Sequence, residues 1–153
     1  MQKVVFVCLG NICRSPLAEA LFKHFIEEKG LQNQFYLDSC GTNGLHDGES
    51  ADLRTRRNAE KHGIQVPSIS RRIKLEDLDF FDIVFTMDQS VHQQVLSMCK
   101  SEEQKSKIRL FREFDHNNPG AEVPDPWYGG EEGFEEVFHI IKENTEIWIN
   151  RLC

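Results

Sequence analysis

A thiol and a guanidinium stand near each other at the start of the chain, in the segment Cys-Leu-Gly-Asn-Ile-Cys-Arg-Ser at positions 8–15. Cys8 ends an apolar run that predicts a strand, and Gly10 lies in the loop that follows. Loop N–H groups and a helix N-terminus bind anions, and the planar guanidinium of Arg14 can bind two oxygens of a phosphate. These positive surroundings favour the thiolate form of Cys8. The segment therefore predicts a nucleophile for the hydrolysis of phosphate esters.

Simpler interpretations of this segment are weaker. Cys8 alone could be an inert buried thiol, since apolar strands contain such cysteines. Gly10 and the helix start Arg-Ser-Pro make a chemical role the better interpretation. The loop lacks the GxxxxGK[ST] and GxGxxG patterns of nucleotide-binding loops. Neither Cys8 nor Cys13 has a partner at zinc-finger spacing, so we predict no metal ligands and no cofactor.

Length and composition limit the classes of protein to which the chain can belong. Its 153 residues fit one domain, positions 1–153, and an apolar fraction of 39% with 11 phenylalanines can form a packed core. A net charge of −7 disfavours nucleic-acid partners, which need a broad basic surface. The five cysteines include no CxxC pair, which indicates free thiols in a reducing compartment. No stretch approaches a membrane span. We therefore expect a cytoplasmic monomer without a membrane partner.

Apolar periodicity predicts strands that alternate with helices. Ser15 as N-cap, Pro16 in the first turn and Gly30 as a stop predict the first helix. The predicted strands cover 4–8, 35–38, 82–87 and 107–110, and the later helices cover 51–62, 88–99 and a C-terminal segment after a loop at 112–132. This order predicts an α/β fold, in which one central four-stranded parallel sheet has helices on both faces and a phosphate-binding loop after its first strand.

Two separate motifs resemble those of a known family. The segment Val-Cys-Leu-Gly-Asn-Ile-Cys-Arg-Ser-Pro, followed by Leu-Ala-Glu-Ala, is similar to the signature of the low-molecular-weight protein tyrosine phosphatases. Asp-Pro-Trp-Tyr at 125–128 resembles the general-acid loop of that family. The similarity continues through 38–39, 62–64, 87–88 and the final helix, and so covers essentially the whole chain. A Cys-x5-Arg pattern alone occurs in unrelated phosphatases, whereas this combination is highly specific.

The resemblance implies a catalytic role for three residues. Cys8 would attack phosphorus and form a phosphocysteine, Arg14 would stabilise the phosphoryl oxygens, and Asp125 would act as general acid and then as base. The expected activity is the metal-independent hydrolysis of phosphotyrosine monoesters. The expected partners are phosphotyrosine-containing proteins, with inorganic phosphate or a similar oxyanion in the same site. Outside this family, Asp125 in Pro-Asp-Pro would be read as an ordinary turn residue.

The resemblance also implies the residues around the substrate. Those expected to bind it are Leu9, Gly10, Asn11, Ile12, Cys13, Ser15, Leu45, Trp127 and Tyr128. Ile12, Leu45 and the two aromatic residues would flank a phenyl ring. Members that prefer phosphoarginine tend to have threonine at the position of Ile12, so phosphotyrosine is the expected substrate. Ser15 would donate its hydroxyl to the Cys8 thiolate.

Supporting residues are expected beneath the loop. Asn11 and Ser39 would brace it, and Asp88 would either orient Arg14 or cap a helix. Ser68 occupies the position of a histidine that many members use in this brace, which leaves open how the loop is held here.

Cys13 has two interpretations that the sequence leaves open. It could trap a peroxide-oxidised Cys8 as a disulfide, or it could fill space under the loop. Two alternative functions are disfavoured. An arsenate reductase would need two more cysteines close together, and only Cys99 lies in a suitable region. A silent phosphoprotein-binding module would be expected to have lost Cys8 or Asp125.

Overall fold

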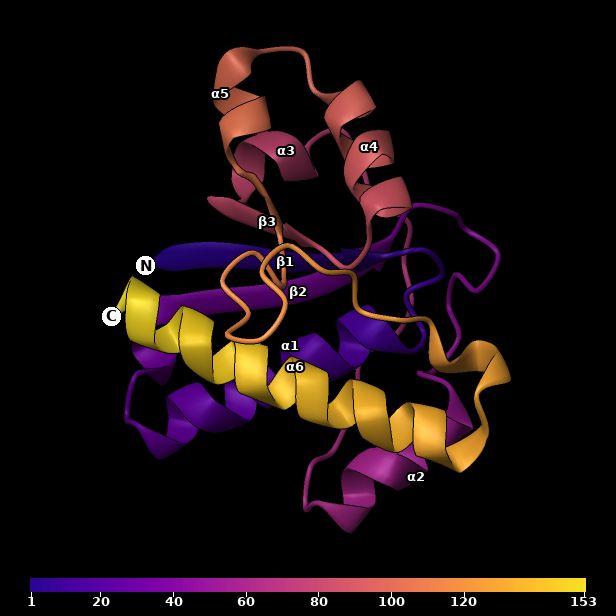
Figure 1. Ribbon diagram of the computed structural model, residues 1–153. Helices are drawn as coiled ribbons and strands as arrows, with labels where there is room; N and C mark the ends of the chain where they lie inside the picture. Colours follow the sequence, from indigo (N-terminus) through magenta and orange to yellow (C-terminus); the bar gives the residue numbers. More distant parts are fainter.

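The apolar run at the start of the chain forms a strand in the interior of the central sheet. In the computed structural model, which describes all residues 1–153 apart from the side chain of Tyr128, the strand order is β2-β1-β3-β4 and every pair is parallel (Figure 1). The strands are β1 (Gln2–Cys8), β2 (Phe35–Gly41), β3 (Ile83–Thr86) and β4 (Ile108–Leu110). The predicted four-stranded parallel sheet is confirmed.

Helices cover both faces of this sheet, as predicted. One face packs against α1 (Arg14–Glu28) and α6 (Gly130–Leu152), with α2 (Leu53–Lys61) beside α6 (Figure 1). The other face is covered by α3 (Asp77–Phe80), α4 (Gln89–Met98) and α5 (Glu102–Ser106). Short 3-10 helices occur at η1 (Gln32–Gln34) and η2 (Pro126–Tyr128). The long helix α6 runs under the sheet and brings the C-terminus close to the N-terminus.

Alternate residues of β1 build two separate hydrophobic clusters. Val4, Phe6 and Cys8 face α1 and α6, whereas Val5 and Val7 face α4. Because both faces of β1 are buried, its sequence is a continuous apolar run and does not alternate between apolar and polar residues. Cys8 thus belongs to the larger cluster, and its fixed place at the end of β1 determines where the loop after it begins.

The start of α1 differs from the prediction. The helix begins at Arg14, and the preceding Cys13 makes no side-chain capping bond. Ser15 is therefore not the N-cap, because its hydroxyl is engaged elsewhere: it lies 3.0 Å from the Cys8 Sγ atom and accepts a hydrogen bond from Asn11.

Other boundaries shift for identifiable reasons. The strand predicted at 35–38 extends to Gly41, because pairing with β1 continues as far as Cys8. The helix predicted at 51–62 starts at Leu53, since the Asp52 side chain caps it. Asp88 does cap α4, by accepting a hydrogen bond from the Val91 N–H. The helices α3 and α5 were not predicted, and the loop at 112–132 is interrupted by η2 and by the start of α6.

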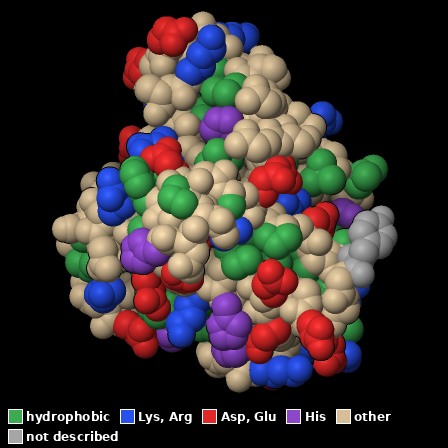
Figure 2. Space-filling view, in the orientation of Figure 1, with side chains coloured by type: hydrophobic (Ala, Val, Ile, Leu, Met, Phe, Trp, Pro, Cys, Tyr) green, Lys and Arg blue, Asp and Glu red, His purple; other side chains and the backbone are tan. Residues whose placement is uncertain are grey.

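Charged side chains are mixed over the visible surface. On the face shown in Figure 2, lysines and arginines are interspersed with aspartates and glutamates, so the described part of that face presents no continuous basic area. None of the helices described by the structure combines the length and the apolar composition needed to cross a bilayer.

Candidate active site

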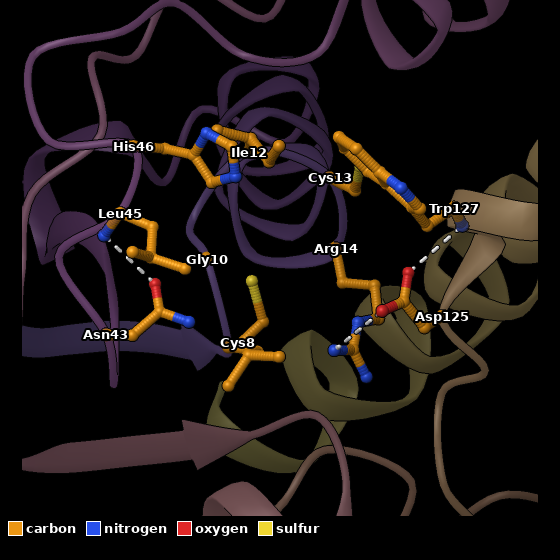
Figure 3. Close-up of a pocket in the computed structure, with 11 residues that line it drawn as sticks. Cys8, Gly10, Ile12, Cys13, Arg14, Asn43, Leu45, His46, Asp125 and Trp127 are labelled. Carbon is orange, nitrogen blue, oxygen red and sulfur yellow. Dashed lines mark hydrogen bonds and ion pairs between the residues drawn. The ribbon is translucent and has the colours of Figure 1, made fainter.

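A cavity of about 280 Å³ lies at the carboxyl end of β1, where ligands bind in open parallel sheets (Figure 3). Its lining residues are Cys8, Leu9, Gly10, Ile12, Cys13, Arg14, Asn43, Leu45, His46, Asp125 and Trp127. The loop after β1, the loop after β2 and the segment before α6 supply these residues. The tertiary fold thus brings the three predicted catalytic residues to one cavity.

The nucleophile loop, residues 8–15, wraps around the floor of this cavity. The Sγ atom of Cys8 points into it, although the residue is only 2% exposed (Figure 3). No backbone amide from Gly10 to Ser15 donates a hydrogen bond to any protein group that the structure describes. Buried amides normally have acceptors, so a row of unpaired N–H groups beside a cavity is a binding surface for an anion.

Arg14 is held on the side of the cavity by two acceptors. Its Nη1 atom donates to the Asp88 carboxylate at 2.7 Å and to the Val123 carbonyl at 3.1 Å, and the side chain is 4% exposed. Burial alone would lower the pKa of Arg14, but the neighbouring Cys8 thiolate and Asp88 raise it above its usual value. Asp88 therefore fulfils both of its alternative roles, because one carboxyl oxygen caps α4 and the other orients the guanidinium.

Asp125 lies at the rim of the cavity, on the same side as Arg14. One of its carboxyl oxygens accepts a hydrogen bond from the Trp127 N–H at 3.0 Å, and the other lies 3.9 Å from the Arg14 Nη2 atom (Figure 3). The side chain is about half exposed. A half-exposed carboxyl facing both solvent and the cavity can exchange protons with a group bound there.

The loop is braced from below through Asn11. This residue has a φ of 56°, in the left-handed region that asparagine tolerates better than most residues. Its Oδ1 atom accepts from the Arg71 backbone N–H at 3.0 Å, its Nδ2 atom donates to the Ser15 hydroxyl at 2.8 Å, and its carbonyl accepts from the Ser70 hydroxyl at 2.5 Å. All its polar atoms apart from its own N–H therefore serve to hold the turn.

This brace also orients the hydroxyl beside the nucleophile. Because the Arg71 N–H fixes the Asn11 oxygen, the Asn11 amide nitrogen must face Ser15 and donate to it. The Ser15 proton is then free to point at the Cys8 Sγ atom at 3.0 Å or at the more distant Cys40 carbonyl at 3.4 Å. The shorter contact favours a hydrogen bond to a Cys8 thiolate.

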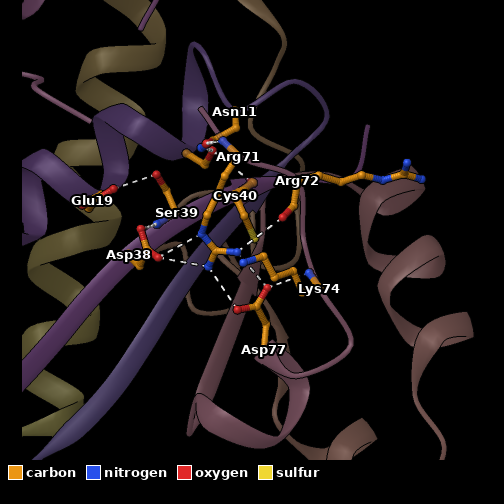
Figure 4. A network of polar contacts seen from close by, with 10 residues as sticks. Asn11, Glu19, Asp38, Ser39, Cys40, Arg71, Arg72, Lys74 and Asp77 are labelled. Carbon is orange, nitrogen blue, oxygen red and sulfur yellow. Dashed lines mark hydrogen bonds and ion pairs between the residues drawn. The ribbon is translucent and has the colours of Figure 1, made fainter. Parts of the chain in front are cut away.

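Ser70 and Arg71 were missed by the sequence analysis, and they resolve how the loop is held without a histidine at position 68. The Arg71 side chain is anchored in turn by ion pairs to Asp38 and Asp77 (Figure 4). Burial would lower the pKa of Arg71, but these two carboxylates hold it above its usual value. No local sequence pattern around positions 70 and 71 could have signalled this contact, which depends on how the chain folds back beside β2.

Four predicted site residues lie outside the cavity lining, one of them Asp88, which contacts Arg14 from behind. Asn11 and Ser15, predicted to bind substrate, have their side chains beneath the loop. Ser39, predicted to brace the loop, instead donates to the Glu19 carboxylate at 2.6 Å (Figure 4). Burial raises the pKa of Glu19 to about 7, although the bond from Ser39 works in the opposite direction. Tyr128, the remaining predicted wall residue, lies outside the described side chains.

The walls of the cavity include two residues that the sequence did not indicate. Asn43 and His46 come from the loop after β2, as does the predicted Leu45 (Figure 3). The His46 ring lies over Gly10, where an added Cβ would come within 3.1 Å of it. The absence of a side chain at Gly10 therefore lets the histidine close this side of the cavity.

The cysteines are all free thiols. Burial raises the pKa of Cys13 to about 12, although a hydrogen bond with Thr55 works against this shift. Cys13 also packs with Ile12 and Phe134, as expected of a residue that fills space under the loop. A group of possible metal ligands, His62, Glu135 and His139, lies between the end of α2 and α6, and none of its members lines the cavity.

Comparison with known proteins identifies the family. Residues 3–153 match the family described as low molecular weight phosphotyrosine protein phosphatase. A Saccharomyces cerevisiae protein of that name is 40% identical over 141 residues, which is 90% of this chain and 87% of the relative. The corresponding Schizosaccharomyces pombe protein is 39% identical over 137 residues, 89% and 87% of the two chains.

A solved structure shows the same fold. The crystal structure of a protein tyrosine phosphatase from Entamoeba histolytica, with Hepes in its active site, superposes with a TM-score of 0.95 and 41% identity. The match covers 99% of this chain and 97% of the other. The resemblance predicted from the two motifs is thus confirmed: the chain belongs to the low molecular weight phosphotyrosine protein phosphatase family, a family of phosphoric monoester hydrolases.

Proposed function

We propose that this protein hydrolyses phosphotyrosine in proteins through a phosphocysteine intermediate and without a metal ion. One observation carries the proposal. The Cys8 Sγ atom faces a cavity in which the unpaired amides of residues 10–15 and the Arg14 guanidinium form a positive cradle, with Ser15 as a hydrogen-bond partner of the sulfur. This arrangement matches what an in-line attack on a bound phosphoryl group requires.

In the first step the Cys8 thiolate attacks phosphorus. An S–P bond forms while the P–O bond to the phenolic oxygen breaks, and the leaving oxygen takes a proton from the Asp125 carboxyl. Arg14 and the loop amides stabilise the charge on the three equatorial oxygens. Proton donation by a positioned carboxyl contributes about 10²–10⁴-fold, so Asp125 matters most for substrates whose leaving groups are strong bases.

In the second step water hydrolyses the intermediate. The Asp125 carboxylate accepts a proton from the water, whose oxygen bonds to phosphorus as the S–P bond breaks. The electron pair returns to Cys8, where the Ser15 hydroxyl at 3.0 Å stabilises the thiolate. Because Arg14 and the backbone dipoles supply the positive charge that the transition state needs, neither step calls for a Lewis acid.

The walls of the cavity support an aromatic substrate. Ile12 lines the base, and Trp127, at 38% exposure, and Leu45, at 80%, stand at the mouth with open apolar surface. A phenyl ring would cover these side chains, whereas the short side chain of phosphoserine would leave them in water. We therefore propose phosphotyrosine as the preferred substrate over phosphoserine and phosphoarginine.

The decisive test is hydrolysis in EDTA. We expect the wild type to cleave p-nitrophenyl phosphate and a phosphotyrosine peptide, Cys8→Ser to be inactive, and Asp125→Ala to retain a small fraction of kcat. Unchanged activity in Cys8→Ser, or a complete requirement for added metal, would overturn the proposal. Peptides carrying phosphotyrosine, phosphoserine or phosphoarginine, compared by kcat/KM, test the substrate separately.

We also propose that Cys13 protects an oxidised nucleophile. Peroxide would convert the Cys8 thiolate to a sulfenic acid, and the Cys13 sulfur would then displace water to form a disulfide. With the pKa of Cys13 raised to about 12, its thiol stays protonated at neutral pH, so the trapping step should be slow. Dithiothreitol should restore activity after peroxide treatment in the wild type and fail to do so in Cys13→Ser.

A further inference from the structure

Arg54 connects two parts of the site without lining the cavity itself. It is the second residue of α2, and its side chain is 45% exposed. Its guanidinium nevertheless makes hydrogen bonds in two directions, toward the base of the nucleophile loop and toward the segment that carries Asp125. Such a concentration of contacts on an exposed arginine calls for a specific explanation.

The first direction leads to the nucleophile loop through Asp52. The Nε and Nη2 atoms of Arg54 each donate to one oxygen of the Asp52 carboxylate, both at 3.1 Å. The backbone N–H of Asp52 donates to the Ile12 carbonyl at 2.8 Å. The bidentate pair therefore fixes the guanidinium relative to the loop that surrounds the phosphate site.

The second direction leads to the general-acid segment. The Nη1 atom of Arg54 donates to the Trp127 carbonyl at 3.0 Å. The guanidinium also lies 4.9 Å from the centre of the Trp127 ring and 4.8 Å from that of Phe134, within the range of cation–π attraction. The Trp127 N–H in turn donates to the Asp125 carboxylate. A single side chain thus links Ile12 to Asp125, through Asp52 on one side and through Trp127 on the other.

We propose that Arg54 is a positioning residue that holds the Asp125 carboxyl within hydrogen-bond distance of the leaving oxygen. The proposal rests on the proposed role of Asp125 as general acid. Asp125 and Trp127 are both partly exposed, although Pro126 between them is buried, so their side chains depend on polar contacts for their positions. Proton transfer needs the donor at about 2.6–3.2 Å, and loss of the guanidinium would let the carboxyl move away from this distance. The phosphate cradle, braced separately by Asn11 and Arg71, would stay intact.

The test compares Arg54→Met with Arg57→Met. Arg57 lies one turn along the same helix, is exposed, and makes no hydrogen bond or ion pair with the side chains that the structure describes, so its loss removes the same charge without the connection. Each variant is assayed with phenyl phosphate, which releases a strongly basic phenolate, and with p-nitrophenyl phosphate, which releases a weakly basic one.

For Arg54→Met we expect kcat/KM to fall about 10-fold with phenyl phosphate and less than 3-fold with p-nitrophenyl phosphate, while the inhibition constant of inorganic phosphate stays unchanged. Arg57→Met should match the wild type with both substrates, and Arg54→Lys should recover part of the loss. In an Asp125→Ala background, Arg54→Met should cause no further loss.

Three results would count against the proposal. Equal losses on the two substrates, or an additive loss in the Asp125→Ala background, would overturn the role of Arg54 alone. If Asp125→Ala itself failed to distinguish the two substrates, the general-acid role of Asp125 would be wrong, and the positioning role would go with it. The Arg54→Lys variant keeps the test valid if the methionine variant folds poorly.

Discussion

Two largely buried arginine–aspartate pairs in this protein differ in how many hydrogen bonds the carboxylate accepts. In the pair Arg112–Asp115, the carboxylate accepts from the Arg112 Nε atom, from the Asn144 amide and from the backbone N–H groups of Asn117 and Asn118. Arg112 also donates to the Glu122 carbonyl. In the pair Arg14–Asp88, only the Arg14 Nη1 atom donates to protein acceptors among the described residues, whereas the Nη2 side of the guanidinium faces the cavity and Asp125.

We interpret the Arg112–Asp115 pair as a structural ion pair and the Arg14–Asp88 pair as part of the proposed active site. Removing charges from water is costly, and the cost is offset only where every donor and acceptor finds a partner. Both carboxyl oxygens of Asp115 have donors, although the buried Asn144 Oδ1 atom has no hydrogen-bond partner among the described residues, and the cluster ties the segment after β4 to α6. The Arg14 pair leaves donors directed at a cavity, so its hydrogen bonding would be completed by an oxyanion. The predictions below test this separation of roles.

The largest expected effect is on catalysis at Arg14. Lysine keeps the charge but cannot bind two phosphoryl oxygens with a planar fork. We expect Arg14→Lys to lower kcat/KM for p-nitrophenyl phosphate about 10³-fold, the upper range for removing a preorganised donor, with little change in the free energy of unfolding. Arg112→Lys is the matched control and should keep kcat/KM within about twofold. Comparable losses of activity in both variants would break the distinction between the pairs.

The next effect is on stability at Asp115. Asp115→Ala removes the carboxylate partner of the partly buried Arg112 and an acceptor of three further N–H donors, so we expect the free energy of unfolding in urea to fall by about 3 kcal/mol. The kcat of the folded fraction should be unchanged. A stable variant with reduced kcat would show that this cluster also serves the active site.

The same cluster should make the protein sensitive to acid. Although burial acts in the opposite direction, the hydrogen bonds from Asn144, Asn118, Arg112 and Asn117 hold the pKa of Asp115 well below its usual value. A carboxyl with a lowered folded pKa contributes stability that is present above its unfolded pKa and is lost as the pH falls. We expect the free energy of unfolding, measured in urea at pH 7 and at pH 3, to fall less on acidification in Asp115→Ala than in the wild type.

The smallest effect is expected at Glu19, where the sign is reversed. Its folded pKa of about 7 lies above that of the unfolded chain, so the folded state retains a proton that the unfolded state releases. Stability should therefore fall as the pH rises from 5 to 7, by on the order of 1–2 kcal/mol for a shift of this size. In Glu19→Gln the free energies of unfolding at pH 5 and pH 7, measured by urea titration, should differ less than in the wild type. A steeper fall in the variant would contradict the assignment.

Local sequence was sufficient to predict the first strand and the loop after it, whereas the role of the segment with Asp125 was predicted only from the family resemblance. The run at 4–8 is apolar throughout because both faces of β1 are buried, and the spacing from Cys8 to Arg14 lies within one continuous loop. Ser15 shows where local rules fail. Its position favours a helix cap, but its hydroxyl instead contacts the Cys8 sulfur and accepts a hydrogen bond from the Asn11 amide, so it does not cap the helix.

The sequence by itself placed a candidate nucleophile and a candidate phosphate-binding cation in one short segment, since residue type and short-range spacing define that pattern, and the family resemblance added Asp125 as a candidate proton donor. Only the tertiary structure decided what holds those groups in place. Ser70, Arg71, Asp88 and Arg54 reach the site from segments far along the chain, and their contacts depend on how the sheet and helices bring distant backbone together. Spacing in sequence carries no information about such contacts, because each one is fixed by the packing of elements that are not neighbours in the chain.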